Sequence, residues 1–321
     1  MDKMKEKEIK EIIQCLGDER TLYHYFKDRY ALMLLSYIIG NGLPVRDLKN
    51  SRFGRLIQKP LLKPIIGEAG SGTLMHRHIG SLWTANYETY RLTLGTWGGH
   101  AGWQRFYNQT SRPGFNLVLQ LNFSTRHNRR YHQMIRPGEI HPFESQSHPI
   151  AGNGEHTLAW ARIDLSMATG EALIEEVQTD WLRMALRGKA TMQAYESGRN
   201  RRRRYTPSVV KYTNCTAQDL EAYIDAVLRP HMAIWDEAIL SAAIWFLREI
   251  IGIRRIFYHT FEWGSQLKAI TGNKPPRSLY TRLPEKFCFR KTSRTPCFLH
   301  KNNNRRKQKL LGSGLGCLKL R

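Results

Sequence analysis

A chain of 321 residues is long enough to bury a large hydrophobic core, and its hydrophobic fraction of 41% excludes a largely disordered protein. Its 50 lysines and arginines outnumber its 27 acidic residues, and the resulting charge of +23 favours a polyanionic partner, DNA or RNA. Five isolated cysteines, none in C-x-x-C spacing, argue against a disulfide framework and favour a cytoplasmic protein. The longest apolar run, residues 30–40, is too short to span a bilayer, so no membrane partner is expected.

The first 110 residues are expected to form a helical and irregular region. Apolar residues recur at helical spacing from Ile9 to Leu16, and a second helix is expected over residues 19–39. Glycine and proline interrupt every pattern between residues 43 and 102, which predicts loops and short elements. A protein partner is a candidate role for this region.

Residues 111–300 are expected to form a mixed-sheet α/β domain. Two helices are expected over residues 216–230 and 234–251, where apolar residues recur every three or four positions. Strands are expected at residues 116–123, 157–165, 171–178, 253–259 and 287–299. The predicted fold class is therefore α/β, with the helical N-terminal region packed on a mixed sheet that has flanking helices.

Two basic stretches are expected to be exposed. Residues 183–215 are interpreted as an insertion, and residues 301–321 as a disordered tail without an acidic residue. Guanidinium groups neutralise phosphates and a tyrosine ring stacks on bases, so the insertion predicts a nucleic-acid contact; a solvated loop is the alternative. The candidate contacts are Arg199, Arg201, Arg202, Arg203, Arg204 and Tyr205.

The stretch ALIEEVQTDWLR, which begins at Ala172, is the strongest candidate for catalytic residues. In a regular strand, Glu176 and Gln178 share a face with Ile174, whereas Glu175 lies on the other face. Adjacent carboxylates in an apolar strand are costly unless they are paired or functional.

A resemblance to a known domain starts in this stretch. The string LIEEVQTDW resembles the IEEIQSDW signature of a domain in large polyvalent proteins of phages and mobile elements. The likeness continues through IRRIFYHT and LYTRLPEKF and covers Leu158 to Leu299. It implies a nucleic-acid-associated protein of mobile-element or host-defence type and assigns no reaction.

The order of elements in the same half is similar to that of GNAT acyltransferases, which transfer an acyl group from an acyl-CoA thioester to an amine. This likeness implies acetyl-CoA or another acyl-CoA as a ligand, with Glu176 as the base and Tyr280 as the acid. It also implies that strands 172–178 and 253–259 separate around a cleft that holds CoA. The glycine-rich pyrophosphate loop of that family is not found after Gln178. The accompanying catalytic candidates are Glu175, Gln178 and Asp180.

The same residues also allow two alternatives to an acyltransferase. Asp164 followed by Glu176-Val177-Gln178 is similar to the pattern of PD-(D/E)xK nucleases, with glutamine in place of lysine, and Asp164 and Glu176 would then hold Mg²⁺. In a non-catalytic nucleic-acid-binding protein, Glu176 would instead pair with an arginine such as Arg162 or Arg183. The surroundings of the two glutamates distinguish these alternatives.

Overall fold

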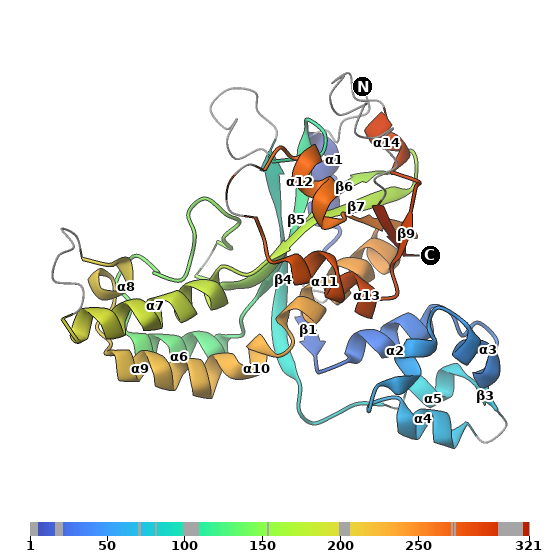
Figure 1. The fold of residues 1–321 in the computed structure, drawn as a ribbon, viewed down its shortest axis with the longest axis horizontal. Helices are drawn as coiled ribbons and strands as arrows, with labels where there is room; N and C mark the ends of the chain where they lie inside the picture. The colour runs from blue at the N-terminus through green and yellow to red at the C-terminus, as the bar shows by residue number, and fades with distance from the viewer. Residues whose placement is uncertain are drawn as a thin grey trace.

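A mixed β-sheet of eight strands organises the protein in the computed structural model (Figure 1). The structure describes residues 6–16, 22–69, 72–80, 82–98, 109–152, 154–198, 206–270, 272, 274–300 and 317–320. The strand order is β1-β4-β5-β6-β7-β8-β10-β9, and β7 and β8 are the parallel pair in an otherwise antiparallel sheet. The strands are β1 (Leu22–Tyr25), β4 (Glu88–Gly98), β5 (Phe115–Asn122), β6 (Thr157–Ser166), β7 (Glu171–Gln178), β8 (Arg255–Tyr258), β9 (Arg290–Thr292) and β10 (Cys317–Leu320). Two short strands, β2 (Leu43–Pro44) and β3 (Thr73–Leu74), pair separately.

Helices gather in groups around this sheet. In Figure 1 the N-terminal helices α2 to α5 lie together at the lower right, and α6 to α9 lie together at the left. The α-helices are α1 (Glu6–Gln14), α2 (Arg29–Ser36), α3 (Val45–Asn50), α4 (Lys63–Glu68), α5 (His76–Gly80), α6 (Thr125–Ile135), α7 (Trp181–Glu196), α8 (Ser208–Lys211), α9 (Ala217–Tyr223), α10 (Arg229–Met232), α11 (Trp235–Trp245), α12 (Phe261–Leu267), α13 (Arg282–Lys286) and α14 (Cys297–His300). Short 3₁₀ turns occur at η2 (Gly54–Gln58) and η5 (Arg277–Tyr280), and π-type turns at η3 (Ile224–Leu228) and η4 (Phe246–Ile250). The expected α/β class with flanking helices is confirmed.

The two faces of the sheet differ in chemistry. One face carries alternating apolar residues such as Leu119, Ile163 and Ile174, which join the main core against α11. The opposite face carries polar side chains that are nevertheless buried, among them Arg162 and Asp164. Burying polar groups is costly unless each finds a partner, so this second face is the natural place to look for function.

The N-terminal region contributes to the sheet, contrary to the expectation of helices and loops alone. The segment expected to be one helix over residues 19–39 contains strand β1 before α2 begins at Arg29. The segment expected to be irregular contains β4, an 11-residue strand that pairs with β1 and β5. Only Tyr90 and Leu92 of β4 are buried. Two buried positions give too short an alternation of apolar and polar residues for the sequence to predict a strand.

The two basic stretches also differ from expectation. The first half of the expected insertion 183–215 is helix α7, which buries Trp181, Leu182 and Ala185 against the rest of the protein. Residues 317–320 of the expected disordered tail form β10, which lies between β8 and β9 with Leu320 buried. The expected closing strand at residues 287–299 is short, because β9 spans three residues and helix α14 follows it.

The nucleic-acid candidates Arg199 and Arg201 to Tyr205 lie outside the described residues, as does the remainder of the basic tail. Within the described part of the chain, no helix combines the length and the apolar character needed to cross a bilayer.

Candidate functional site

A β-bulge in β7 brings Glu175 and Glu176 to the same polar face. Ile163 is opposite Ile174 and Arg162 is opposite Glu176, so Glu175 is an extra residue with no partner in β6. Such a bulge shifts the alternation of all residues beyond it by one position. The expectation that Glu176 shares a face with Ile174 is therefore wrong.

Glu176 lies in a buried cluster of cations. Its Oε2 atom lies 2.7 Å from an Arg162 nitrogen and 3.7 Å from Lys268 Nζ, and the Gln178 amide donates to Oε1. Burial would raise the pKa of Glu176, but the charges of Lys268 and Arg162 outweigh it and the pKa is lowered. The expected arginine pair with Arg162 is thus present. A carboxylate held in this way is a weak proton acceptor.

Glu175 forms a second buried cluster that sequence reasoning missed. Ser111 donates from its backbone N to Glu175 Oε1 at 3.0 Å and from its hydroxyl to Oε2 at 2.8 Å. His259 Nε2 lies 3.0 Å from the same Oε2 and 2.7 Å from Ser111 Oγ. The hydrogen bond and charge of His259, with Lys268, hold the pKa of Glu175 well below its usual range although burial opposes this.

The Ser111, His259 and Glu175 cluster does not have the geometry of a nucleophile relay. In such a relay the serine and the acid bind opposite nitrogens of the imidazole. Here both bind Nε2, and His259 Nδ1 is buried without a partner in the described part of the structure. We interpret the cluster as structural. Glu175 and His259 belong to LIEEVQTDW and IRRIFYHT, the strings that carry the resemblance, whereas Ser111 lies far from both in the chain and nothing in the sequence pointed to it.

Asp164 is paired separately from Glu176. Arg112 donates to both of its carboxylate oxygens at 2.8 Å, and the Arg112 guanidinium lies 4.3 Å from the Phe298 ring centroid. Among the described residues, no three histidine, cysteine or acidic side chains are grouped so that they could hold a metal ion. Asp164 and Glu176, the residues that a magnesium-dependent nuclease would require, are thus each bound by a different arginine.

A histidine and an aspartate lie together where β7 ends. His148 Nδ1 lies 2.9 Å from both oxygens of Asp180, the residue that precedes α7. Trp160 Nε1 donates to Asp180 Oδ2 at 3.2 Å, and Arg183 also pairs with Asp180. Burial would raise the pKa of Asp180, but the hydrogen bond and charge of His148 lower it.

This His148–Asp180 dyad has the features of a general base. The His148 side chain is 26% exposed whereas that of Asp180 is 9% exposed, so the carboxylate is fixed and the imidazole can be reached. Because Asp180 binds Nδ1, the proton of neutral His148 resides there and Nε2 is left as an acceptor. Within the described residues, His148 Nε2 has no hydrogen-bond partner. Asp180 was among the predicted catalytic residues, but nothing in the sequence singled out His148.

The parallel pairing of β7 with β8 stops before β7 ends. The two strands pair from Glu171 with Arg255 to Ile174 with Tyr258, after which β8 ends and β7 continues to Gln178. A cavity of about 500 Å³ lies at the end of β7, lined by the start of α7, by residues of α10 and α11, and by residues 275–279, which follow α12. Its lining residues are Gln178, Thr179, Leu182, Arg183, Leu186, Arg187, Met232, Trp235, Pro275, Pro276 and Leu279.

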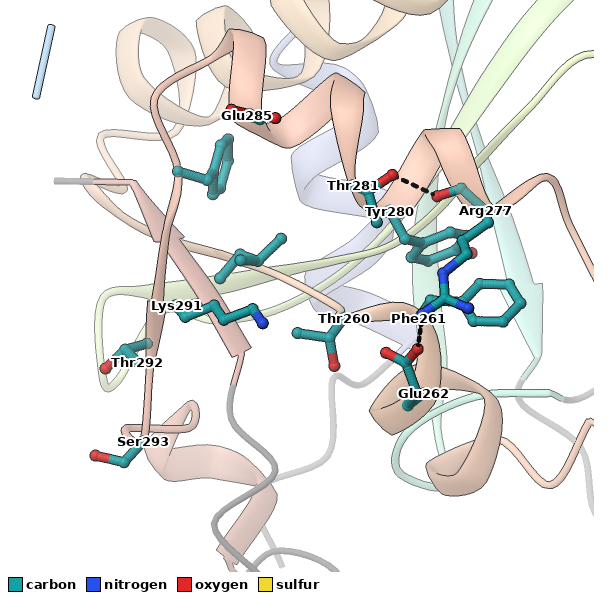
Figure 2. Close-up of a pocket in the computed structure, with 12 residues that line it drawn as sticks. Thr260, Phe261, Glu262, Arg277, Tyr280, Thr281, Glu285, Lys291, Thr292 and Ser293 are labelled. Carbon is teal, nitrogen blue, oxygen red and sulfur yellow. Dashed lines mark hydrogen bonds and ion pairs between the residues drawn. The ribbon is translucent and has the colours of Figure 1, made fainter.

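Tyr280 lies next to Leu279, on the other side of the same turn. It lines a second cavity of about 740 Å³, where Figure 2 shows Tyr280, Phe261 and Arg277 facing Lys291 and neighbouring residues of β9. The Tyr280 side chain is buried, and its hydroxyl has no hydrogen-bond partner among the described residues. Burial first, and then the charge of Glu176, raise the pKa of Tyr280 well above its usual value. The hydroxyl is therefore neutral and free to donate.

The predicted catalytic residues thus divide into two groups. Glu175, Glu176 and Asp180 are buried in ion pairs and hydrogen bonds, whereas Gln178 lines the first cavity and Tyr280 lines the second. Comparison of the chain with protein-family models, with curated proteins and with solved structures gives no match.

Proposed function

We propose that the protein is an acyl-CoA-dependent acyltransferase with a GNAT-like core. The observation that carries the proposal is that the parallel pairing of β7 and β8 stops at Ile174 and Tyr258 while β7 continues to Gln178, where a cavity lies. The position of β10 between β8 and β9 also supports it, because the resemblance implies one continuous mixed sheet around this pair.

The cavity at the start of α7 has the chemistry that a thioester ligand requires. Leu182, Met232 and Trp235 offer an apolar wall for a long, uncharged arm. Arg183 and Arg187 lie on successive turns of α7 and could meet the phosphates of CoA. The bound thioester would supply the activated acyl group.

The base in this proposal differs from the one that the GNAT resemblance implies, which is Glu176. His148 and Tyr280 both interact electrostatically with Glu176, since the charge of His148 lowers the pKa of Glu176 and the charge of Glu176 raises that of Tyr280. His148 Nε2 would accept the proton that the attacking amine loses, and the neutral Tyr280 hydroxyl would donate a hydrogen bond to the leaving sulfur. Glu176 would hold Arg162 and Lys268 in place instead of acting as the base.

Ligand binding tests the proposal without knowledge of the acceptor amine. A ligand present at 100 times its Kd stabilises the native state by about 2.7 kcal/mol, so acetyl-CoA and CoA should raise the Tm by several degrees. Arg187→Glu should weaken this shift, because it reverses the charge beside the expected phosphates. Arg129→Glu on α6 is the matched control, an exposed arginine that does not line the cavity, and should leave the shift unchanged.

Two results would count against the proposal. One is the absence of any thermal shift with millimolar acetyl-CoA or CoA. The other is an equal loss of the shift in Arg187→Glu and Arg129→Glu, which would indicate attraction to the net charge of the protein and not a site. In either case a non-catalytic nucleic-acid-binding protein becomes the better interpretation.

A further inference from the structure

A cluster of aromatic side chains, two of them exposed, lies at the far edge of the sheet, away from both cavities described above. The cluster, called here the aromatic patch, consists of His24, Phe26, Trp83 and Tyr87, with Arg29 beside it. Trp83 is 52% exposed and Tyr87 is 42% exposed, which is unusual for such large rings.

The rings of the patch hold one another in place. Trp83 packs edge-on against Tyr87, Phe26 and His24 with centroid distances of 5.3, 5.6 and 6.0 Å, and His24 lies 5.1 Å from Tyr87. The Arg29 guanidinium lies 5.7 Å from the Trp83 ring, and it donates to the carbonyl oxygen of His24. The two exposed rings are therefore fixed at the surface before any ligand binds.

A hollow adjoins the patch. It has a volume of about 620 Å³, and its walls include Arg29, His76, Trp83 and Trp245. Phe26, Trp83 and Arg29 belong both to the patch and to this hollow, so a planar group that stacks on Trp83 would lie at its mouth.

Charge favours an anionic ligand. The chain as a whole carries a charge of +23, and the charged residues among those that line the hollow are Arg29, at the rings, and Glu249. Arg29 at the edge of the rings disfavours a cationic ligand such as a methylated lysine, which would otherwise suit an aromatic cage. Planar rings next to positive charge instead match a ligand that has flat bases and negative phosphates.

We propose that the aromatic patch binds single-stranded nucleic acid by stacking bases on Trp83 and Tyr87. Two adjacent exposed rings suit successive bases of a strand better than a single nucleotide. The proposal does not depend on the acyltransferase proposal, because none of the residues of the patch lines either cavity near β7. It also places a nucleic-acid contact in a region for which the sequence indicated only a protein partner.

The test measures fluorescence anisotropy of labelled twelve-nucleotide oligothymidylate and oligouridylate with the full chain. Base stacking contributes about 1–3 kcal/mol per base, so Trp83→Ala should raise the Kd about 5- to 150-fold. Trp83→Phe should restore most of the affinity. The salt slope of binding should stay unchanged in Trp83→Ala, since loss of a stacked ring releases no additional counterions.

Ile140→Ala is the matched control. Ile140 is 46% exposed, close to the exposure of Tyr87, but lies in the loop between α6 and β6, outside the patch and outside the basic stretch 183–215, and its loss should not alter the Kd. Heparin, a polyanion without bases, should bind wild type and Trp83→Ala equally well. Thymidine monophosphate should compete with the strand only weakly.

Five results would overturn the proposal. They are an absence of oligonucleotide binding, equal affinity of wild type and Trp83→Ala for the oligonucleotides, an equal loss in Ile140→Ala, an equal loss of heparin binding in Trp83→Ala, and full competition by the mononucleotide at the affinity of the strand. The first result would leave a peptide partner for the patch, and the last would identify a nucleotide site.

Discussion

Replacing Glu176 with alanine should reveal whether this carboxylate holds the fold together. The change leaves two cations buried without their anion, because the Arg162 and Lys268 side chains are each 1% exposed. Arg162 keeps a hydrogen bond to the Gln109 carbonyl oxygen, and Lys268 keeps one to the Glu175 carbonyl oxygen, but neither partner carries a charge.

The magnitude follows from burial. Removing one partner of a buried ion pair typically costs about 3–5 kcal/mol, whereas an exposed pair contributes about 0–1 kcal/mol. In a chain of this size, a loss of 3–5 kcal/mol lowers the Tm by about 4–7 °C. The double substitution Glu176→Leu with Arg162→Met should recover part of this loss, since it removes both charges together.

Denaturant unfolding followed by circular dichroism measures the effect. Glu262→Ala is the control, because Glu262 pairs with Arg277 at the surface and both side chains are about half exposed or more. We expect a loss below about 1 kcal/mol there. A loss below 1 kcal/mol in Glu176→Ala would refute the structural role and return Glu176 to the position of a catalytic candidate.

Two further predictions concern stability. Burial lowers the pKa of His231 to about 4, from 6.5 in the unfolded chain, and its Nδ1 atom lies 2.9 Å from the Tyr90 hydroxyl. As the pH falls from about 6.5 to about 4, the unfolded state takes up the proton first, so His231 should account for a loss of about 3 kcal/mol over that range. His231→Gln should flatten the curve of unfolding free energy against pH in this window, and an unchanged curve would contradict the prediction. Deleting residues 317–321 should prevent stable folding, because β10 pairs with both β8 and β9 and buries Cys317, Leu318 and Leu320. A truncated chain that melts cooperatively near the wild-type temperature would show that β10 is dispensable.

Much of the C-terminal half could be predicted because its patterns are strong. The helices around Leu220 and Ile239 and the strands β5 to β7 have long runs of apolar residues at clear spacing, and the structure confirms them. The strand expected at residues 253–259 is also present, as the four-residue β8. Strands β1, β9 and β10 span only three or four residues each, too few for a period to emerge. Their place in the sheet depends on distant partners, as β10 shows by pairing with a strand about 60 residues earlier.

The basic composition of Arg183 to Glu196 concealed a helix. Arginine and lysine are good helix formers, and the apolar side of α7 consists of widely spaced residues such as Leu182, Ala185 and Met192. Reading the segment by charge gave an exposed insertion, whereas reading it by periodicity would have given an amphipathic helix. Charge describes the solvent side of such a segment and leaves its fold open.

The bulge at Glu175 explains why the carboxylates could be chosen correctly and still be placed wrongly. The prediction assumed that side chains alternate along a regular strand. One extra residue puts Glu175 and Glu176 on the same face of the sheet, and Ile174 on the other face. Two carboxylates on one buried face would repel each other, so the fold supplies Arg162 and Lys268 to one and His259 to the other. These partners lower the pKa values of both glutamates, so neither is an effective proton acceptor. The acceptor that remains reachable is His148, whose orientation is fixed by Asp180, two residues beyond the end of the same strand.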